Sequence, residues 1–250
     1  MQVKMDNKNQ SRRQFLKSGA LAAVAVPYII PGSALGKNGA VAPSNRIVMA
    51  AIGLGAQGRE DLRGFLSKDE VQMIAICDVD ISHAARAKTL VDERNGNSNC
   101  KLYSDFRELY AREELDAVMT ALPDHWHAIP AIAAAKAGID VHGQKPFVRT
   151  IAEGRALANA VKKYNIVWQT GSQQRSDYRF RYACELVRNG RIGKISHVEV
   201  GVGGGEVSPG LNPIQPVPKS LDWDFWIGPA PMVPYRGVSH LSWRHIKDYG

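Results

Sequence analysis

Three glycines near the first apolar run of the chain are spaced as in sites that bind phosphate groups. They form the pattern Gly53-x-Gly55-x-x-Gly58, and the apolar run before them starts at Ile47. The first glycine permits a tight strand-to-helix turn, the second lets the backbone approach a pyrophosphate, and the third allows close helix packing. The free amides of the helix N-terminus stabilise phosphates. The pattern predicts a bound dinucleotide, with Gln57 in the turn as a further contact.

An acidic residue after the second apolar run, residues 71–77, distinguishes between the two common dinucleotides. Asp78 follows this run directly, twenty residues after Gly58. A carboxylate at that place accepts hydrogen bonds from the adenosine ribose hydroxyls, which favours NAD over NADP. The alternative is a flavodoxin-like domain in which the glycine turn is empty.

Polar side chains gather after three later apolar runs, in residues 121–127, 142–147 and 170–175. Lysine, histidine, glutamine and arginine in these segments are suited to a polyhydroxylated substrate. Each segment taken alone also fits a capped or solvated loop. All three are expected at the same edge of a sheet, and this convergence favours a functional site.

The elements that position these residues alternate between apolar strands and amphipathic helices. Such alternation is typical of an α/β fold with a doubly wound parallel sheet of the Rossmann type, in which ligands bind at the carboxyl ends of the strands. We expect strands at residues 47–53, 71–77, 117–120, 140–142 and 166–169, and helices at residues 58–65, 81–93, 106–111, 128–137 and 151–163.

The first 36 residues are expected to be a twin-arginine signal peptide. Arg12 and Arg13 precede Phe-Leu-Lys, a modestly apolar stretch follows, and small residues at 33–36 offer a cleavage point. An amphipathic helix or membrane anchor is the alternative, but Pro27 interrupts the apolar stretch, which is shorter than the roughly 20 residues of a spanning helix. The sequence therefore predicts the twin-arginine export machinery as a partner, a periplasmic or otherwise exported location, and no stable membrane anchor.

Export by this route has a consequence for the cofactor. The route carries folded proteins, and dinucleotides are scarce outside the cytoplasm, so we expect NAD to be held tightly and recycled within one catalytic cycle. A ligand that binds only the native state also stabilises it.

The charge and cysteine content exclude several other classes of protein. Of the formal net charge of +8, the first 36 residues contribute +4, and the mild, scattered remainder gives no case for nucleic-acid binding. The three cysteines are too few and too dispersed for a disulfide framework or a zinc site. No metal is therefore expected.

Two of the polar segments resemble motifs of the Gfo/Idh/MocA family, whose members include glucose–fructose oxidoreductase and inositol dehydrogenase. Gln144-Lys145-Pro146 stands where the family has Glu-Lys-Pro, and residues 123–127 are similar to its Pro-x-x-x-His motif. Residues 186–195 resemble the helix and turn that lead into the family's second domain. The resemblance covers about residues 46–250.

The resemblance implies hydride transfer between a hydroxyl carbon of a sugar or cyclitol and nicotinamide. Lys145 is then the catalytic base and a ribose contact, while Pro123 and His127 shape the nicotinamide-ribose pocket. Gln174 and Arg175 are expected contacts at the domain junction. Glutamine at position 144 removes a negative charge beside Lys145, which makes this lysine a better base.

The resemblance also implies a second domain, of which residues 171–250 are the first part. We expect residues 37–45 to be a linker, residues 46–170 the nucleotide domain, and the last segment an incomplete α+β sheet domain for substrate and oligomerisation. A strand is expected at 196–202. Because the family's Asp-x-x-x-His helix would lie beyond Gly250, we expect a C-terminally truncated chain, and a homo-oligomer for the full-length protein.

Other interpretations of the same residues remain open. Transient oxidation of a sugar by retained NAD permits glycoside cleavage, so an NAD-dependent hydrolase or lyase is one alternative. A non-catalytic dinucleotide sensor is another. Trp223 and Trp226 either stack on a sugar ring or anchor the joint between the domains.

Overall fold

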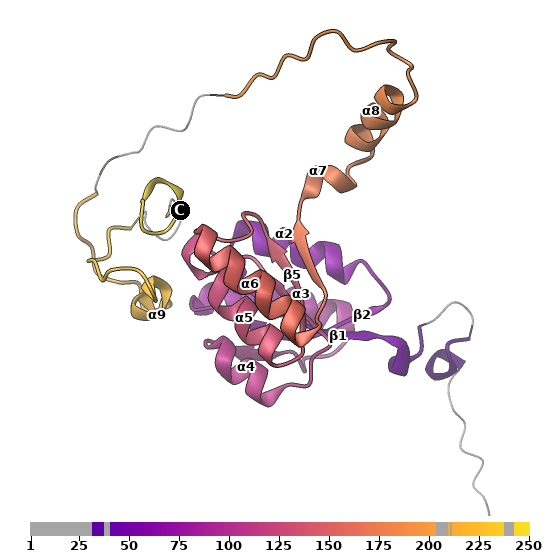
Figure 1. Cartoon of the computed structure of the whole chain (residues 1–250). Helices are drawn as coiled ribbons and strands as arrows, with labels where there is room; N and C mark the ends of the chain where they lie inside the picture. Colours follow the sequence, from indigo (N-terminus) through magenta and orange to yellow (C-terminus); the bar gives the residue numbers. More distant parts are fainter. Residues whose placement is uncertain (1–31, 38–40, 204–209, 211, 238–242) are drawn as a thin grey trace, which may run out of the picture. The chain divides into compact units, whose positions relative to one another are not determined.

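The computed structural model describes residues 32–37, 41–203, 210, 212–237 and 243–250 (Figure 1). The chain divides into two compact units, Met1–Ser44 and Asn45–Gly250. The described part before the first strand holds two short 3-10 helices, η1 (Gly32–Leu35) and η2 (Pro43–Asn45). The predicted twin-arginine motif lies outside the described residues. No helix of the described part is long and apolar enough to span a membrane.

The second unit contains a six-stranded parallel sheet in the order β3-β2-β1-β4-β5-β6. This order and the helices between the strands confirm the predicted Rossmann-type doubly wound fold. The strands are β1 (Ile47–Ile52), β2 (Val71–Cys77), β3 (Lys101–Tyr103), β4 (Ala117–Thr120), β5 (Asp140–Gln144) and β6 (Trp168–Gly171).

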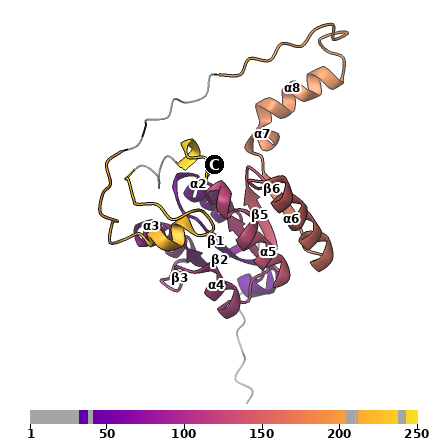
Figure 2. The same ribbon diagram turned by 60° about the vertical axis from the view of Figure 1, so that its left-hand side comes forward.

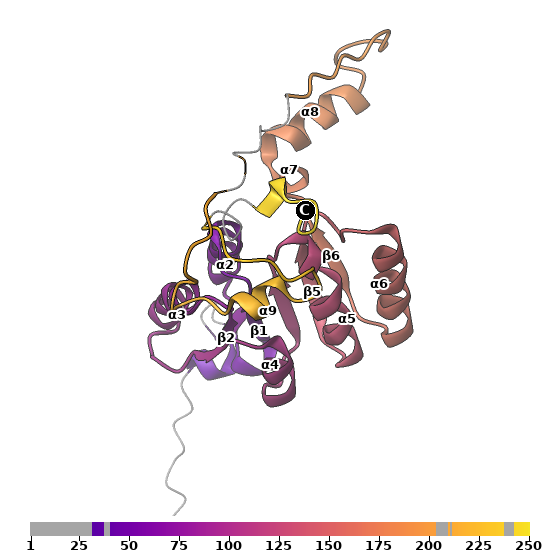
Figure 3. The same cartoon turned by 90° about the vertical axis from the view of Figure 1, so that its left-hand side faces the viewer.

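Helices cover the two faces of this sheet in the order that the crossovers dictate (Figure 3). On one face, α2 (Ala56–Leu66) and α3 (Ile81–Asn95) pack against Met49 and Ala51 of β1. The other face carries α4 (Phe106–Arg112), α5 (Ala128–Lys136) and α6 (Ile151–Tyr164). Because neighbouring residues of β1 point to opposite faces, this one strand contributes to both cores.

Local sequence signals account for the ends of the helices. The side chain of Asp80 accepts a hydrogen bond from the amide of Ser82 and caps α3, which ends at Gly96 in the left-handed conformation. Thr150 and Glu153 form a capping box at the start of α6. The expected strands and helices between residues 47 and 171 agree with the structure to within two residues at each end. Strand β3 was missed, because three residues are too short to show a period.

After β6 the structure has two helices, α7 (Gln173–Ser176) and α8 (Tyr178–Arg188), but the expected strand at 196–202 is wrong. Val198, Val200 and Val202 alternate as in a strand, yet they are 71 %, 76 % and 88 % exposed. A strand needs a partner for its backbone hydrogen bonds, and none of the described residues pairs with this segment. No strand of a second sheet is present in the described part of the chain.

The last segment returns to the carboxyl end of β2 (Figure 2). The amide of Ile81 donates to the carbonyl of Ser220 at 2.8 Å, and the amide of Asp222 donates to that of Val79 at 3.0 Å. Helix α9 (Trp223–Ile227) and the 3-10 helix η4 (Trp243–His245) follow. Buried side chains of this segment form a third apolar cluster, against which Val79 packs.

Candidate active site

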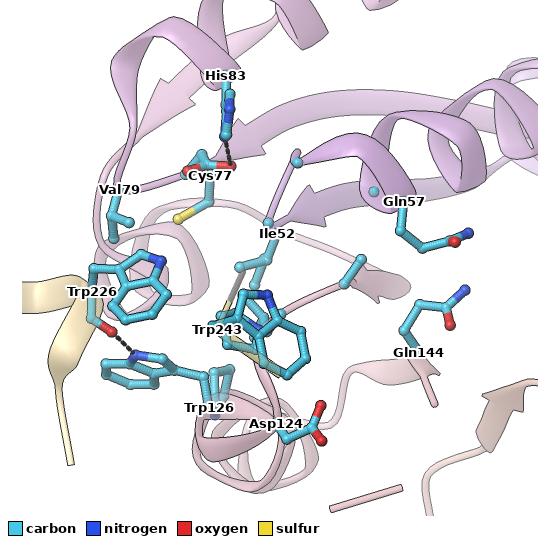
Figure 4. Close-up of a pocket in the computed structure, with 18 of the residues that line it drawn as sticks. Ile52, Gln57, Cys77, Val79, His83, Asp124, Trp126, Gln144, Trp226 and Trp243 are labelled. Atoms are coloured by element: carbon cyan, nitrogen blue, oxygen red, sulfur yellow. Dashed lines mark hydrogen bonds and ion pairs between the residues drawn. The ribbon is translucent and has the colours of Figure 1, made fainter. Parts of the chain in front are cut away.

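A cavity of about 550 Å³ lies where most of the predicted site residues meet, at the carboxyl ends of β1, β2, β4 and β5 (Figure 4). Its wall includes the glycine turn, Asp78, residues 122–124 and residues 144–146. Trp226, Trp243 and Arg244 of the last segment close another side. The fold thus brings segments that are far apart in the sequence to one edge of the sheet.

The glycine turn fits a bound pyrophosphate. A Cβ at Gly53, where φ is +80°, would overlap the carbonyl oxygen of Ala121, and one at Gly58 would overlap the carbonyl oxygen of Gly53. These two positions therefore exclude larger residues for reasons of packing alone. A Cβ at Gly55 would meet nothing within 4 Å. The space that a side chain would occupy there is open, as close approach of a ligand to the backbone requires.

Asp78 supports this turn from the end of β2. Its Oδ2 accepts a hydrogen bond from the amide of Leu54 at 2.6 Å, and its Oδ1 accepts one from the amide of Asp80 at 2.8 Å. A carboxylate oxygen that bonds an amide can also accept from a ribose hydroxyl, because each oxygen has two acceptor sites. His83 Nδ1 lies 3.8 Å from Oδ2, and burial lowers the pKa of His83. Asp78 therefore fixes the glycine turn and also lines the cavity.

The segment after β4 places Pro123 at the cavity, whereas the ring of His127 contacts the backbone of its own turn. Pro123 is part of the wall. His127 is 5 % exposed, its Nε2 lies 2.8 Å from the carbonyl oxygen of Leu122, and it does not line the cavity. The ring of His127 thus holds the turn that carries Pro123.

Asp124 is a cavity residue that the sequence interpretation missed. In Figure 4 its carboxylate points into the space between Trp243 and Gln144. Among the described residues, its Oδ1 is a buried atom without a hydrogen-bond partner. Burial raises the pKa of Asp124, although Lys145 and Arg244 oppose the shift. An acidic residue next to a proline at a strand end was the signal available in the sequence.

Lys145 follows β5 and lines the cavity. Its backbone amide donates to Oε1 of Gln144 at 3.0 Å, and the peptide bond to Pro146 is cis. Gln144 is 3 % exposed, and its Nε2 donates to Oδ2 of Asp61 at 2.7 Å. Gln57 also lines the cavity and donates to the other oxygen of Asp61. Asp61 was not singled out in the sequence, where only helical spacing linked it to Gln57.

Gln174 and Arg175 are not brought together with the other predicted residues. Both are exposed in α7 and outside the cavity wall. Arg175 instead lines a separate, open groove between α2 and the β5–β6 edge.

Aromatic side chains form the apolar side of the cavity. Trp126 Nε1 donates to the carbonyl of Trp226 at 2.7 Å, and the rings of Trp223 and Trp226 stack with centroids 4.9 Å apart. Trp223 and Trp226 are 7 % and 5 % exposed, as the anchoring interpretation predicts. Trp226 and Trp243 in addition line the cavity.

His125 joins the last segment to the nucleotide domain. Its Nε2 lies 3.2 Å from the carbonyl oxygen of Trp226, and its Nδ1 lies 3.4 Å from that of Tyr249. The residue is buried, and burial lowers its pKa. Within the described ranges, no group of three or more His, Cys, Asp or Glu side chains is arranged to hold a metal ion.

Comparison with known proteins places these features in context. A family model for the Gfo/Idh/MocA oxidoreductases, with an NAD-binding Rossmann fold, matches residues 47–172. A glycosyl hydrolase family 109 protein of Stenotrophomonas maltophilia is 28 % identical over 202 residues, covering 76 % of this chain and 41 % of that protein. Myo-inositol 2-dehydrogenase of Thermotoga maritima is 31 % identical over 146 residues, covering 58 % of this chain and 42 % of that enzyme.

Solved structures include a similar fold with its cofactor present. The structure of scyllo-inositol dehydrogenase from Lactobacillus casei, with bound NAD(H) and scyllo-inositol, has a TM-score of 0.55 and 25 % identity, covering 60 % of this chain and 43 % of that one. The chain spans less than half the length of each of these relatives.

Proposed function

Because the chain belongs to the Gfo/Idh/MocA oxidoreductase family with its NAD-binding Rossmann fold, we propose that the protein is an NAD-dependent oxidoreductase that acts on a hydroxyl group of a sugar or cyclitol. One observation carries the proposal: a single cavity brings together the glycine turn, Asp78 and Lys145. These are the groups needed to hold a dinucleotide and to move a hydroxyl proton.

The chain's own residues define where the cofactor is held. The backbone at Gly55 and the N-terminus of α2 accommodate the pyrophosphate, because no side chain fills that space. The carboxylate of Asp78, which lines the cavity, accepts hydrogen bonds from the adenosine ribose hydroxyls. When bound, the nicotinamide supplies hydride transfer.

Lys145 moves the proton of the reacting hydroxyl. A general base must reach the proton within about 3 Å in the bound complex, and Lys145 is one of the residues that line the cavity. The aromatic side formed by Trp126, Trp226 and Trp243 excludes water from this reaction. Asp124, on the same wall, is a second group able to hold or accept a proton.

Replacement of Lys145 by methionine tests the proposal. Turnover of NAD⁺ with a panel of cyclitols and sugars that includes myo-inositol is followed by NADH absorbance, and NADH binding by fluorescence titration. We expect Lys145→Met to lower turnover by at least about a hundredfold, while the Kd for NADH changes by less than about threefold. Normal turnover in this variant would exclude the proposed role of Lys145.

A second candidate function is glycoside cleavage with NAD retained through the cycle. The alignment with the family 109 protein, which covers 76 % of this chain, favours it, because it extends beyond the nucleotide domain. Product analysis separates the two functions. A ketosugar formed together with NADH supports the dehydrogenase, whereas release of the substituent without net NADH supports the hydrolase or lyase.

We further propose export through the twin-arginine route with NAD already in place. Arg12 and Arg13 before Phe-Leu-Lys support it. In cell fractionation, the protein should be found outside the cytoplasm, and the variant with both arginines replaced by lysine should stay inside. The purified exported protein should release a nucleotide on denaturation. Its absence would contradict tight retention but not NAD binding itself.

A further inference from the structure

Asp61 stands behind the cavity wall and joins two of the polar side chains that form it. Gln57 and Asp61 are four residues apart on α2, so they lie on the same face of the helix. Gln57 Nε2 donates to Asp61 Oδ1 at 2.9 Å, and Gln144 Nε2 donates to Asp61 Oδ2 at 2.7 Å. The carboxylate thus connects the start of α2 to the end of β5.

The chain of hydrogen bonds continues to the peptide that carries Lys145. Gln144 Oε1 accepts the backbone amide of Lys145 at 3.0 Å. Strand β6 leaves room for this side chain, because a Cβ on the paired Gly171 would lie only 3.1 Å from Gln144 Nε2. The side-chain amide of Gln144 is therefore hydrogen-bonded through both its nitrogen and its oxygen, and Gly171 of β6 lies beside it.

The donors and acceptors in this series of hydrogen bonds match in only one arrangement. An ionised carboxylate only accepts hydrogen bonds, whereas a glutamine amide donates at one end and accepts at the other. Glutamine at 144 therefore satisfies both Asp61 and the Lys145 amide. A glutamate at 144 would place a second carboxylate against Asp61, and one of the two would have to take a proton or move away.

We propose that Asp61 is a positioning residue of the active site, which orients Gln57 and Gln144 and, through Gln144, the backbone that carries Lys145. This inference rests on the proposed function, because it assumes that the cavity holds NAD beside Lys145.

Exchange of the two partners tests the inference. Gln144→Glu places two carboxylates together, and Asp61→Asn leaves one amide without an acceptor. The double variant Asp61→Asn/Gln144→Glu restores every hydrogen bond, because the introduced asparagine amide then donates to the introduced carboxylate. Asp140→Asn is the matched control: Asp140 begins the same strand, and its Oδ1 accepts the Val167 amide far from the cavity.

Two measurements at pH 7.5 on the full-length protein decide the outcome. We expect Gln144→Glu to lower the melting temperature by about 4 °C or more and to weaken NADH binding, followed by fluorescence at a temperature where all variants are folded, by about tenfold. Asp61→Asn should weaken binding by about threefold, and the double variant and Asp140→Asn should stay within about twofold of the wild type.

The results separate the inference from the proposed function. If the double variant binds NADH no better than Gln144→Glu, or if both single variants bind like the wild type, Asp61 does not position the site. If the variants differ in melting temperature but not in NADH affinity, the role of Asp61 is only structural, which also overturns the inference. If the wild type binds no NADH, the proposed function fails, and the melting temperatures alone decide whether Asp61 and Gln144 are coupled.

Discussion

The cavity has two kinds of wall, and they depend on different physical causes. The glycine turn after β1 is shaped by the backbone, since Gly53 and Gly58 have no room for a Cβ. Other parts of the wall are shaped by side chains: Asp61 accepts from Gln144, which accepts the Lys145 backbone amide, and Trp126 donates to the carbonyl of Trp226. Gly53 and Gly58 tolerate almost no substitution, whereas the parts of the wall formed by side chains tolerate exchanges that preserve the contacts.

The largest effect is expected at Gly58. Gly58→Ala forces a methyl group onto the carbonyl oxygen of Gly53, so we expect a loss of stability of about 3 kcal/mol or more, or no folded protein. Gly64→Ala in the same helix is the control. Nothing lies within 4 Å of its Cβ, and the variant should be more stable by about 0.5–1 kcal/mol. If Gly58→Ala and Gly64→Ala changed the free energy of unfolding in urea by the same amount, backbone contacts at Gly58 would not shape the wall.

Trp223 tests how the last segment supports the cavity residue Trp226. Trp223 is 7 % exposed, stacks on Trp226 and donates to the carbonyl of Val233, but does not line the cavity. Trp223→Ala should cost about 3 kcal/mol, and Trp223→Phe much less. We expect hydrogen exchange to rise in residues 221–227 and to stay unchanged in β1 and β2. Faster exchange throughout the sheet would show that this cluster is part of the main core.

Gly55 separates ligand approach from packing. Because its Cβ position is open, Gly55→Ala should keep the melting temperature of the free protein within about 2 °C. NADH affinity should fall by about tenfold, because the methyl group occupies space that the pyrophosphate needs. Unchanged affinity in a fluorescence titration would place the nucleotide elsewhere.

The smallest effect is expected from His125. Burial lowers its pKa below the ordinary value, so the folded state binds this proton less readily than the unfolded state. Stability should therefore decrease as the pH falls below about 6.5 and level off below the folded-state pKa. His83 and His142 are shifted in the same direction, so single His→Asn variants of all three are compared by thermal melting from pH 5 to 7.5. If the stability of the His125→Asn variant falls with pH as steeply as that of the wild type, the pH dependence arises from His83 and His142 instead.

The same contrast explains what the sequence predicted. Spacing alone was enough to single out Gly53, Gly55, Gly58 and Asp78, because a strand-to-turn-to-helix unit is local in the sequence. Five strands and their helices followed from periodicity for the same reason. Pro123 and Lys145 lie in two of the polar segments expected at strand ends, and their predicted roles came from the resemblance to the Gfo/Idh/MocA family.

Contacts between distant segments were not predictable in this way. Asp61 accepts a hydrogen bond from Gln144, which lies 83 positions away in the sequence. No local pattern predicts which acceptor a buried side-chain amide will bind. His127 matched a motif, yet its ring bonds to its own turn. The alternating valines at 198–202 have the period of a strand, but a strand forms only where a partner completes its hydrogen bonds. Gln174 and Arg175 remain predicted contacts that this structure leaves outside the cavity.

We propose that one cavity holds NAD with its pyrophosphate at the glycine turn and its nicotinamide beside Lys145. A crystal structure of the protein with NAD⁺ tests this most directly. We expect electron density for the pyrophosphate over Gly55, for the adenosine ribose at Asp78 and for the nicotinamide next to Lys145. Density for the dinucleotide outside this cavity, or a nicotinamide turned away from Lys145, would contradict it.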